Sequence, residues 1–173
     1  IFSGCQSSSS EKGSITGTLS NADKITVYLQ RITDQGDQTL DSTVTDSNGH
    51  FTLRNMSSGL DYYVIRTGPA NVLFLVLKGG ERVELTGDAR RLDQSYTVKG
   101  SEDSELLRQL RQYEKSLSDS LNQAYAIARD AHPEKKDSIG IVLQQHYTVS
   151  MAEFSKTFIS GHLHSIVSLS ATK

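Results

Sequence analysis

The stretch 40-LDSTVTDSNGHFTLR-54 carries the strongest local structural signal in this sequence. Two short runs, 40–45 and 50–54, flank the tetrapeptide DSNG. Asn48 and Gly49 tolerate positive φ at both central positions of a tight turn, and such a turn matches the twist of two paired strands. The stretch therefore predicts a β-hairpin, and with it a β-rich fold for the neighbouring chain.

The β pattern continues on both sides of this stretch. Ile25, Val27 and Leu29 alternate with Thr, Tyr and Gln, the period of two that places one set of side chains on a core face. Strands are expected at 14–19, 25–30, 40–45, 50–54, 62–67, 72–77, 82–86 and 95–99, with turns or breaks at 34–37, 67–69, 78–80 and 87–88. Short strands separated by glycine-containing turns predict an antiparallel β-sandwich or partly open barrel over 13–100.

After the β region the periodicity becomes helical. Apolar residues recur at steps of three and four, at Leu106, Leu110, Tyr113, Leu117, Leu121, Ala124 and Ala128. Ser101 is a favourable N-cap, and the acidic residues after it suit the positive end of a helix dipole. A second stripe follows Pro133, at Ile139, Leu143, Tyr147, Met151, Phe154 and Phe158. We predict an αα-hairpin over 101–173, with Gly161 ending the second helix and 165–173 beginning another element. The fold class is α+β.

The composition limits the functional classes. The chain has 173 residues, of which 36% are hydrophobic and 22% are charged, and its formal net charge is -2. This length suits one sizeable core, or a small β unit with a helical unit. The charge and the lack of a basic stripe argue against nucleic-acid binding. The most apolar run, 72–77, has the length of a buried strand and not of a membrane-spanning helix.

Cys5 is the single cysteine of the chain. One cysteine excludes an internal disulfide framework and a Cys-x-x-Cys redox pair, and it cannot start a usual structural zinc site. The segment 1-IFSGC-5 reads as the end of a secretory hydrophobic region followed by small residues, and it resembles the lipobox of bacterial lipoproteins. The resemblance implies cleavage before Cys5, a lipid anchor on its thiol and a serine-rich tether over 6–13. The alternative is an unmodified thiol at a frayed terminus.

A series of strand and turn motifs spans the β region. In order, these are GTL at 17–19, VYL at 27–29, LDS at 40–42, D-x-NG-x-F at 46–51, YYV at 62–64, VLKGG at 76–80 and VKGS at 98–101. The series resembles the uncharacterised domain that lies before thioredoxin-like domains in lipoproteins of Bacteroidetes bacteria. The resemblance implies three segments: the end of a lipoprotein signal with its tether (1–12), a β domain (13–100) and a helical connector truncated before a thioredoxin-like domain (101–173).

From this resemblance we expect a noncatalytic, cofactor-free module that tethers and positions the redox domain of a membrane-anchored thiol–disulfide oxidoreductase. The expected location is the bacterial cell envelope, facing the periplasm or associated with the outer membrane. The expected partners are the membrane, through Cys5, and the downstream thioredoxin-like domain, and the module is compatible with a homodimer. The alternative is a surface lipoprotein module that binds a glycan or a peptide, although the absence of Trp counts against sugar stacking. The third class is an enzyme whose site the sequence does not reveal.

Few residues suggest a site, and none suggests catalysis. His162 and His164 are metal candidates because alternate residues of an extended strand share one side. Their place at a helix end instead favours contacts with the helix terminus and no metal. Tyr62 and Tyr63 point to opposite faces of one strand, so one ring is expected inside and the other is available for surface recognition. His146, on an otherwise apolar helix, is expected to be partly buried and hydrogen-bonded.

Overall fold

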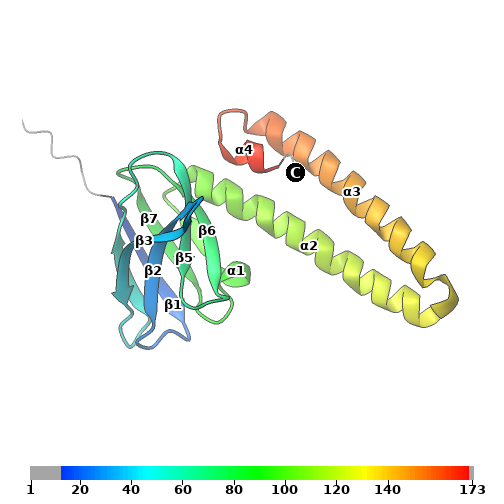
Figure 1. Cartoon of the computed structure of the whole chain (residues 1–173), viewed down its shortest axis with the longest axis horizontal. Helices are drawn as coiled ribbons and strands as arrows, with labels where there is room; N and C mark the ends of the chain where they lie inside the picture. The colour runs from blue at the N-terminus through cyan, green and yellow to red at the C-terminus, as the bar shows by residue number, and fades with distance from the viewer. Residues whose placement is uncertain (1–12, 172–173) are drawn as a thin grey trace, which may run out of the picture. The chain divides into compact units, whose positions relative to one another are not determined.

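The computed structural model describes residues 13–171 (Figure 1). Its strands are β1 (Ser14–Ser20), β2 (Thr26–Thr33), β3 (Gly36–Val44), β4 (His50–Arg54), β5 (Asp61–Arg66), β6 (Val72–Leu77), β7 (Arg82–Asp88) and β8 (Thr97–Lys99). Its helices are α1 (Leu92–Ser95), α2 (Glu102–Ala131), the 3-10 turn η1 (Pro133–Lys135), α3 (Lys136–Gly161) and α4 (Val167–Ser170). The chain clusters into two compact units, one ending at Glu105 and the other beginning at Leu106.

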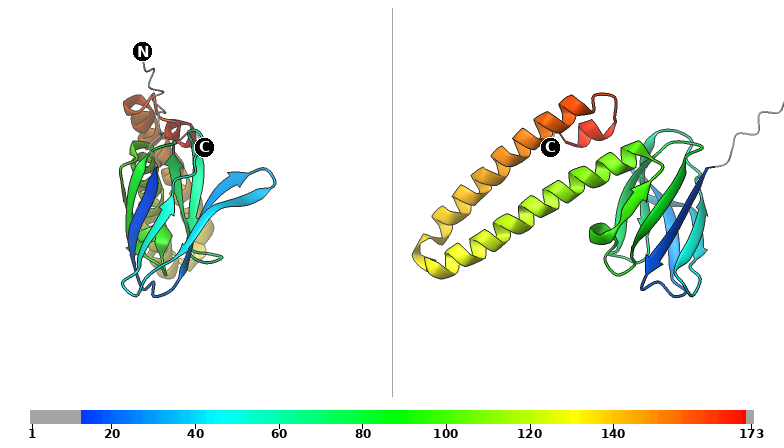
Figure 2. Two further views of the ribbon diagram at one scale, coloured as in Figure 1. Left: turned by 90° about the vertical axis from the view of Figure 1, so that its left-hand side faces the viewer. Right: turned by 180° about the vertical axis from the view of Figure 1, so that it is seen from behind.

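The first unit contains two four-stranded sheets (Figure 2). The strand order is β4-β1-β7-β8 in one sheet and β3-β2-β5-β6 in the other. Apolar side chains from both sheets form one buried core: Ile15, Leu19, Val27, Leu29, Phe51, Leu53, Tyr63, Ile65, Leu73, Leu75, Leu77, Val83, Leu85, Leu92 and Val98. The predicted α+β class and the sandwich are confirmed, and both described sheets are open.

The stretch 40–54 is not a hairpin, so this sequence-based prediction is wrong. β3 pairs with β2, whereas β4 pairs with β1 in the other sheet. The connection 45–49 therefore crosses between the sheets. Gly49 has a φ of 79°, but Asn48 has no positive φ, so the turn is not the two-residue turn that would pair β3 with β4. The Asp46 carboxylate instead accepts the backbone N–H groups of Asn48 and His50.

A second connection between the sheets lies at the predicted turn 78–80. The segment 78–80 joins β6, at the edge of one sheet, to β7, in the middle of the other. β7 pairs in parallel with β1, from Ser14 opposite Arg82 to Ser20 opposite Asp88. The fold therefore contains one parallel pair that the antiparallel expectation did not include. Parallel strands need a long connection, and the chain between β1 and β7 supplies it by building most of both sheets.

The β2–β3 hairpin agrees with the predicted turn at 34–37. Thr33 pairs with Gly36, whose φ is 112°. The left view of Figure 2 shows this hairpin extending beyond the rest of the sandwich. Near the end of the β region, the short helix α1 occupies residues 92–95, so β8 is shorter than the expected strand 95–99.

The helical predictions are confirmed in outline. α2 begins directly after Ser101, whose side-chain oxygen accepts the backbone N–H of Ser104 at 3.4 Å, as an N-cap does. α3 ends at the predicted Gly161. In the second unit the rings of Tyr113 on α2 and Phe154 on α3 stack with centroids 3.8 Å apart. The two apolar stripes therefore meet and form an αα-hairpin, visible in Figure 1.

None of the helices in the described range 13–171 combines the length and the hydropathy needed to cross a bilayer.

Candidate functional site

Cys5 and the tether over 6–12 lie outside the described residues. Lipidation of Cys5 therefore stays a prediction from the sequence motif. The other residues singled out from the sequence lie in β5 and around the end of α3, where their surroundings are described below.

The two tyrosines of β5 lie on opposite faces of its sheet. Tyr63 is 1% exposed and belongs to the core, and burial raises the pKa of its phenol. Tyr62 is half-buried on the outer face, opposite Val76 of β6. The structure thus places one ring inside, as expected, and leaves Tyr62 as the candidate for surface recognition.

An ordered polar network lies on the outer face of the same sheet. The Arg66 guanidinium on β5 donates to the Gln30 side-chain oxygen at 2.8 Å, to an Asp37 carboxylate oxygen at 2.8 Å and to the Pro69 carbonyl at 2.9 Å. Gln30 in turn donates to the Thr39 hydroxyl at 3.1 Å. These bonds join β2, β3 and β5 and hold the Arg66 head in one orientation, since its acceptors lie on β2, on β3 and in the connection between β5 and β6.

Two exposed aromatic rings flank this network. Tyr28 lies directly opposite Arg66 and is 36% exposed. Phe74 lies opposite Val64, which is itself opposite Gln30, and Phe74 is 38% exposed. We name Tyr28, Gln30, Arg66 and Phe74 the outer-sheet patch. A pair of rings beside an amide and a guanidinium can stack on a planar or sugar group and hydrogen-bond to its polar edge.

The sequence reasoning missed most of the outer-sheet patch. The alternation in 25–30 already marks Tyr28 and Gln30 as outward-facing, because Val27 and Leu29 face the core. Which strand lies beside them depends on sheet register. That register, which brings Arg66 and Phe74 alongside, has no local signature in the sequence.

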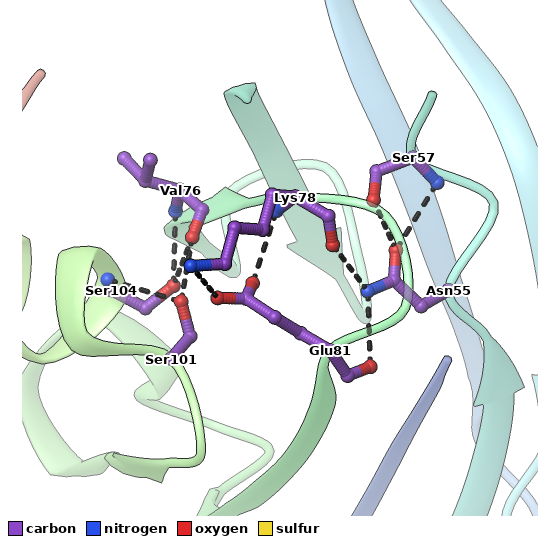
Figure 3. A network of polar contacts seen from close by, with 7 residues as sticks. All are labelled: Asn55, Ser57, Val76, Lys78, Glu81, Ser101 and Ser104. Atoms are coloured by element: carbon purple, nitrogen blue, oxygen red, sulfur yellow. Dashed lines mark hydrogen bonds and ion pairs between the residues drawn. The ribbon is translucent and has the colours of Figure 1, made fainter. Parts of the chain in front are cut away.

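A second polar network joins the sandwich to the start of α2 (Figure 3). β6 is an edge strand, and its residue Val76 forms hydrogen bonds with two serines. The Val76 N–H donates to the Ser104 hydroxyl at 3.0 Å. The Val76 carbonyl accepts from Ser104 at 2.7 Å and from Ser101 at 2.9 Å. Both serines are buried, so the first turn of α2 is fixed to this edge.

Figure 3 also shows the polar contacts that hold the β6–β7 connection. The Asn55 side-chain amide donates to the carbonyls of Lys78 and Glu81, both at 3.1 Å. Its oxygen accepts the Ser57 hydroxyl at 2.6 Å. Asn55 is buried, and it satisfies backbone groups of a segment that has no strand partner of its own. The network is structural, because every group in it already has a hydrogen-bond partner.

The histidines do not gather into a site. His162 and His164 lie in the turn that follows α3 and not on an extended strand. The centroid of the His162 ring lies 4.9 Å from that of the Phe158 ring, and the backbone carbonyl of His162 accepts the Ser168 hydroxyl. His146 is exposed, so the prediction that it is partly buried is wrong. Over residues 13–171, no three His, Cys, Asp or Glu side chains are grouped closely enough to hold a metal ion.

The comparison with protein families agrees with the β domain. Residues 14–107 match the family described as Domain of unknown function (DUF4369). The chain belongs to this family. The DUF4369 match runs past Ser101 and Ser104, so it includes the first turn of α2 together with both sheets. The serines that bond to Val76 are therefore part of the DUF4369 domain and not of a separate linker.

The other comparisons give no information on activity. Among proteins with curated descriptions, none matches the chain. Among solved structures, the DUF4369 chain is similar to sea bream transthyretin, in complex with thyroxine, at 16% identity and a TM-score of 0.33 over 51% of this chain and 95% of that one. An (S)-allantoin synthase matches at 13% identity and a TM-score of 0.34, over 53% of this chain and 44% of that one. A 9R-lipoxygenase from Cyanothece PCC8801 matches at 13% identity and a TM-score of 0.27, over 77% of this chain and 26% of that one.

Proposed function

We propose that this chain is the noncatalytic N-terminal module of a membrane-anchored thiol–disulfide oxidoreductase of the bacterial envelope. Its role is to tether and position a thioredoxin-like domain encoded after Lys173. The lipobox-like segment ending at Cys5 supports the anchor, and the resemblance of the strand motifs to lipoproteins with thioredoxin-like domains supports the redox partner. The location follows from the anchor: the module faces the periplasm or is associated with the outer membrane.

The observation that carries the positioning role is the attachment of α2 to the β6 edge. A flexible linker would leave the helix start free to move relative to the sheet. Here Ser101 and Ser104 make three hydrogen bonds with Val76, each contributing about 1 kcal/mol when buried. α2 then continues for 30 residues, about 45 Å at 1.5 Å per residue. The chain then returns along α2 as α3, so fixing the first turn of α2 fixes where the helical hairpin begins.

The complete gene and its product test the proposal. We expect a Cys-x-x-Cys motif after the codon for Lys173, and we expect Cys5→Ser to move the full-length protein from the membrane to the soluble fraction without loss of reductase activity. A coding sequence that stops shortly after Lys173 would remove the redox partner from the proposal. Membrane retention of the Cys5→Ser variant would remove the lipid anchor.

A paired variant tests positioning separately from chemistry. In the full-length anchored protein, Ser101→Ala with Ser104→Ala should lower the reduction of envelope proteins and leave the reduction of a small soluble disulfide unchanged. Ser116→Ala with Ser120→Ala, also on α2 but exposed, is the matched control and should change neither rate. Equal rates for both double variants on both substrates would contradict the positioning role.

The outer-sheet patch supports a second candidate function, the binding of a glycan or an extended peptide. Tyr28 and Phe74 flank the Gln30–Arg66 pair on an exposed sheet face. We expect glycan and peptide arrays probed with the soluble domain to give signals that the double variant Tyr28→Ala with Phe74→Ala loses. Ile32→Ala, at an exposed residue of the β2–β3 hairpin, is the control. Array signals that survive the double variant would exclude the patch as the binding site.

A further inference from the structure

The connection 45–49 between the sheets contains the dipeptide Asn48-Gly49. The side-chain carbonyl carbon of an asparagine is open to attack by the backbone nitrogen of the next residue. Glycine hinders that attack least, because it has no Cβ. Asn48 is the single asparagine of the chain's five that precedes a glycine. The sequence therefore concentrates this chemistry at one position.

The two reacting groups lie in different surroundings. Asn48 is exposed, and its side-chain amide has no hydrogen-bond partner among the described residues. Gly49 is buried. Its carbonyl accepts the Leu19 N–H at 3.0 Å, and a Cβ at Gly49 would collide with the Leu19 carbonyl oxygen. The group under attack is therefore open to water, whereas the attacking nitrogen belongs to a residue held against β1.

A turn over residues 46–49, which we name the Asp46 turn, holds the attacking nitrogen away from its target. The Gly49 N–H donates to the Asp46 carbonyl at 3.0 Å. Neither Ser47 nor Asn48 has a positive φ, so the turn is of type I. In a type I turn the ψ angle of the third residue is about 0°. This angle eclipses the Gly49 nitrogen with the Asn48 nitrogen and rotates it away from the Asn48 side chain, so the closed turn prevents the attack.

The Asp46 carboxylate stabilises the closed turn. It accepts the Asn48 N–H at 2.8 Å and the His50 N–H at 2.9 Å. The Asp46 side chain is 51% exposed, so water competes for both hydrogen bonds. Exposed segments of this kind open locally at a lower free energy than global unfolding requires. On opening, rotation about the Cα–C bond of Asn48 brings the Gly49 nitrogen beside the Asn48 side chain.

We propose that Asn48 is a site of self-modification and that opening of the Asp46 turn gates the reaction. The Gly49 nitrogen bonds to Cγ of Asn48, the Cγ–Nδ2 bond breaks, and ammonia leaves with the Gly49 amide proton. The product is a five-membered succinimide ring. Water then opens the ring at one of its two carbonyl carbons. Addition at Cγ gives aspartate at position 48, and addition at the main-chain carbon gives isoaspartate.

The isoaspartyl product changes the connection between the sheets. Its main chain runs through Cβ and Cγ of residue 48, so it is one atom longer than before. Gly49 then cannot keep both its bond to Asp46 and its close approach to Leu19, and the crossing from β3 to β4 is weakened. The reaction is irreversible, so the product accumulates with the time that the turn spends open. This inference concerns only the Asp46 turn and does not rest on the proposed redox function.

Peptide mass spectrometry of the complete chain tests the site. The chain is incubated at neutral pH, folded in buffer or unfolded in urea, and each asparagine is followed for the exchange of ammonia for water. We expect modification at Asn48 ahead of the other asparagines, and faster modification in urea than in the folded chain. An unmodified Asn48 in urea would overturn the site, and equal rates in the two conditions would overturn the gating.

Two variants test whether the Asp46 turn is the gate. Asp46→Ala should raise the rate at Asn48 in the folded chain about tenfold, as the loss of one or two hydrogen bonds implies. Asp88→Ala is the matched control and should leave the rate unchanged, because the Asp88 carboxylate accepts a backbone N–H, that of Arg90 at 2.9 Å, in a different connection. Equal increases in both variants would show that global unfolding admits the reaction, and would overturn the gating.

A third variant tests the gate in the opposite direction and does not require a weakened turn to fold. Ser47→Pro places proline at the second position of a type I turn, which favours it, so the turn should open less often. We expect slower modification of Asn48 in the folded chain and an unchanged rate in urea. A folded-state rate equal to that of the wild type would contradict control by this turn.

The consequence for the fold is tested with the two products. Asn48→Asp supplies the aspartyl product with a main chain of normal length, and the isoaspartyl chain is separated from an aged sample by chromatography. We expect a lower urea midpoint for the isoaspartyl chain than for the Asn48→Asp variant. Equal midpoints would show that the connection tolerates the longer main chain and would overturn the proposed weakening.

Discussion

Arg54 on β4 binds Asp41 on β3 across the gap between the two sheets. The Arg54 backbone N–H and its guanidinium donate to the two carboxylate oxygens of Asp41, at 2.8 Å and 3.0 Å. β3 and β4 are the edge strands of different sheets, and the connection 45–49 joins them. One carboxylate thus links two edges that share no strand pairing, on the side of the sandwich opposite the Ser104–Val76 contact.

This pairing gives the fold an acid-sensitive component. The pKa values of Asp41, Asp46, Asp61 and Asp88 lie below the usual value for an aspartate. The largest cause is a guanidinium hydrogen bond for Asp41 and Asp61, and a backbone N–H for Asp46 and Asp88. Because the unfolded chain binds these protons at higher pH than the folded chain, their stabilisation is complete above the unfolded pKa and is lost as the pH falls through the folded values.

We therefore expect the urea midpoint of the chain to stay level from about pH 7 to pH 5 and to fall below about pH 4. Unfolding curves recorded across this range measure the change. Asp41→Asn should lower the midpoint at neutral pH and flatten part of the acid dependence, whereas Asp34→Asn, in the β2–β3 turn, should do neither. A urea midpoint that rises on acidification would contradict the lowered pKa values assigned to these aspartates in the folded chain.

The sequence predicted the elements better than their partners. The strand 72–77 agrees with β6 at both ends, and the helix after Ser101 begins where its N-cap and acidic first turn indicate. These signals are local, because side-chain alternation and capping depend on residues a few positions apart. The segment DSNG marked a real reversal of the chain. It could not reveal that the strands on either side belong to different sheets, since that depends on contacts with β1 and β2.

The residues of the candidate site show the same contrast between local signals, which the sequence carries, and contacts between distant strands, which it does not. Opposite faces for Tyr62 and Tyr63 were predicted from alternation alone. The outer-sheet patch needed the register of three strands, and the Ser104–Val76 bonds needed the edge position of β6. His146 was expected to be partly buried because its helix neighbours are apolar. It lies instead on the exposed face of α3, where apolar neighbours such as Val149 are exposed as well.

Thr45 is expected to be critical for the crossing between the sheets. Its buried hydroxyl accepts the Ile25 N–H at 2.9 Å and donates to the Ala22 carbonyl. Thr45→Val keeps the shape but leaves these two backbone groups without that partner, so we expect a loss of about 2 kcal/mol in the free energy of unfolding. Thr43→Val, at a less buried residue of β3, is the control for the added methyl group. A loss no larger than that of the control would show that the hydroxyl is dispensable.

Phe154 is expected to hold the helical hairpin together. Its ring stacks on Tyr113 and lies 5.7 Å from the Phe158 ring. Phe154→Asp places an unpaired charge on the packed face of α3, so circular dichroism should show a large loss of helix and a lower melting temperature. Ile127→Asp, at an exposed apolar residue of α2, controls for the introduced charge. A native helix signal in the Phe154 variant would mean that the packed faces of the hairpin are assigned wrongly.

Ser104 is expected to protect the β6 edge. An edge strand exposes backbone groups that can pair with another chain, and β6 is strongly apolar, with the sequence VLFLVL. Ser104→Ala leaves the buried Val76 N–H without its partner, which should cost about 1–3 kcal/mol, and it weakens the cover over the edge. We expect a lower urea midpoint and faster aggregation on mild heating, followed by light scattering. Ser116→Ala, at an exposed position of the same helix, should change neither, and a Ser104→Ala variant as stable as this control would exclude the protective role.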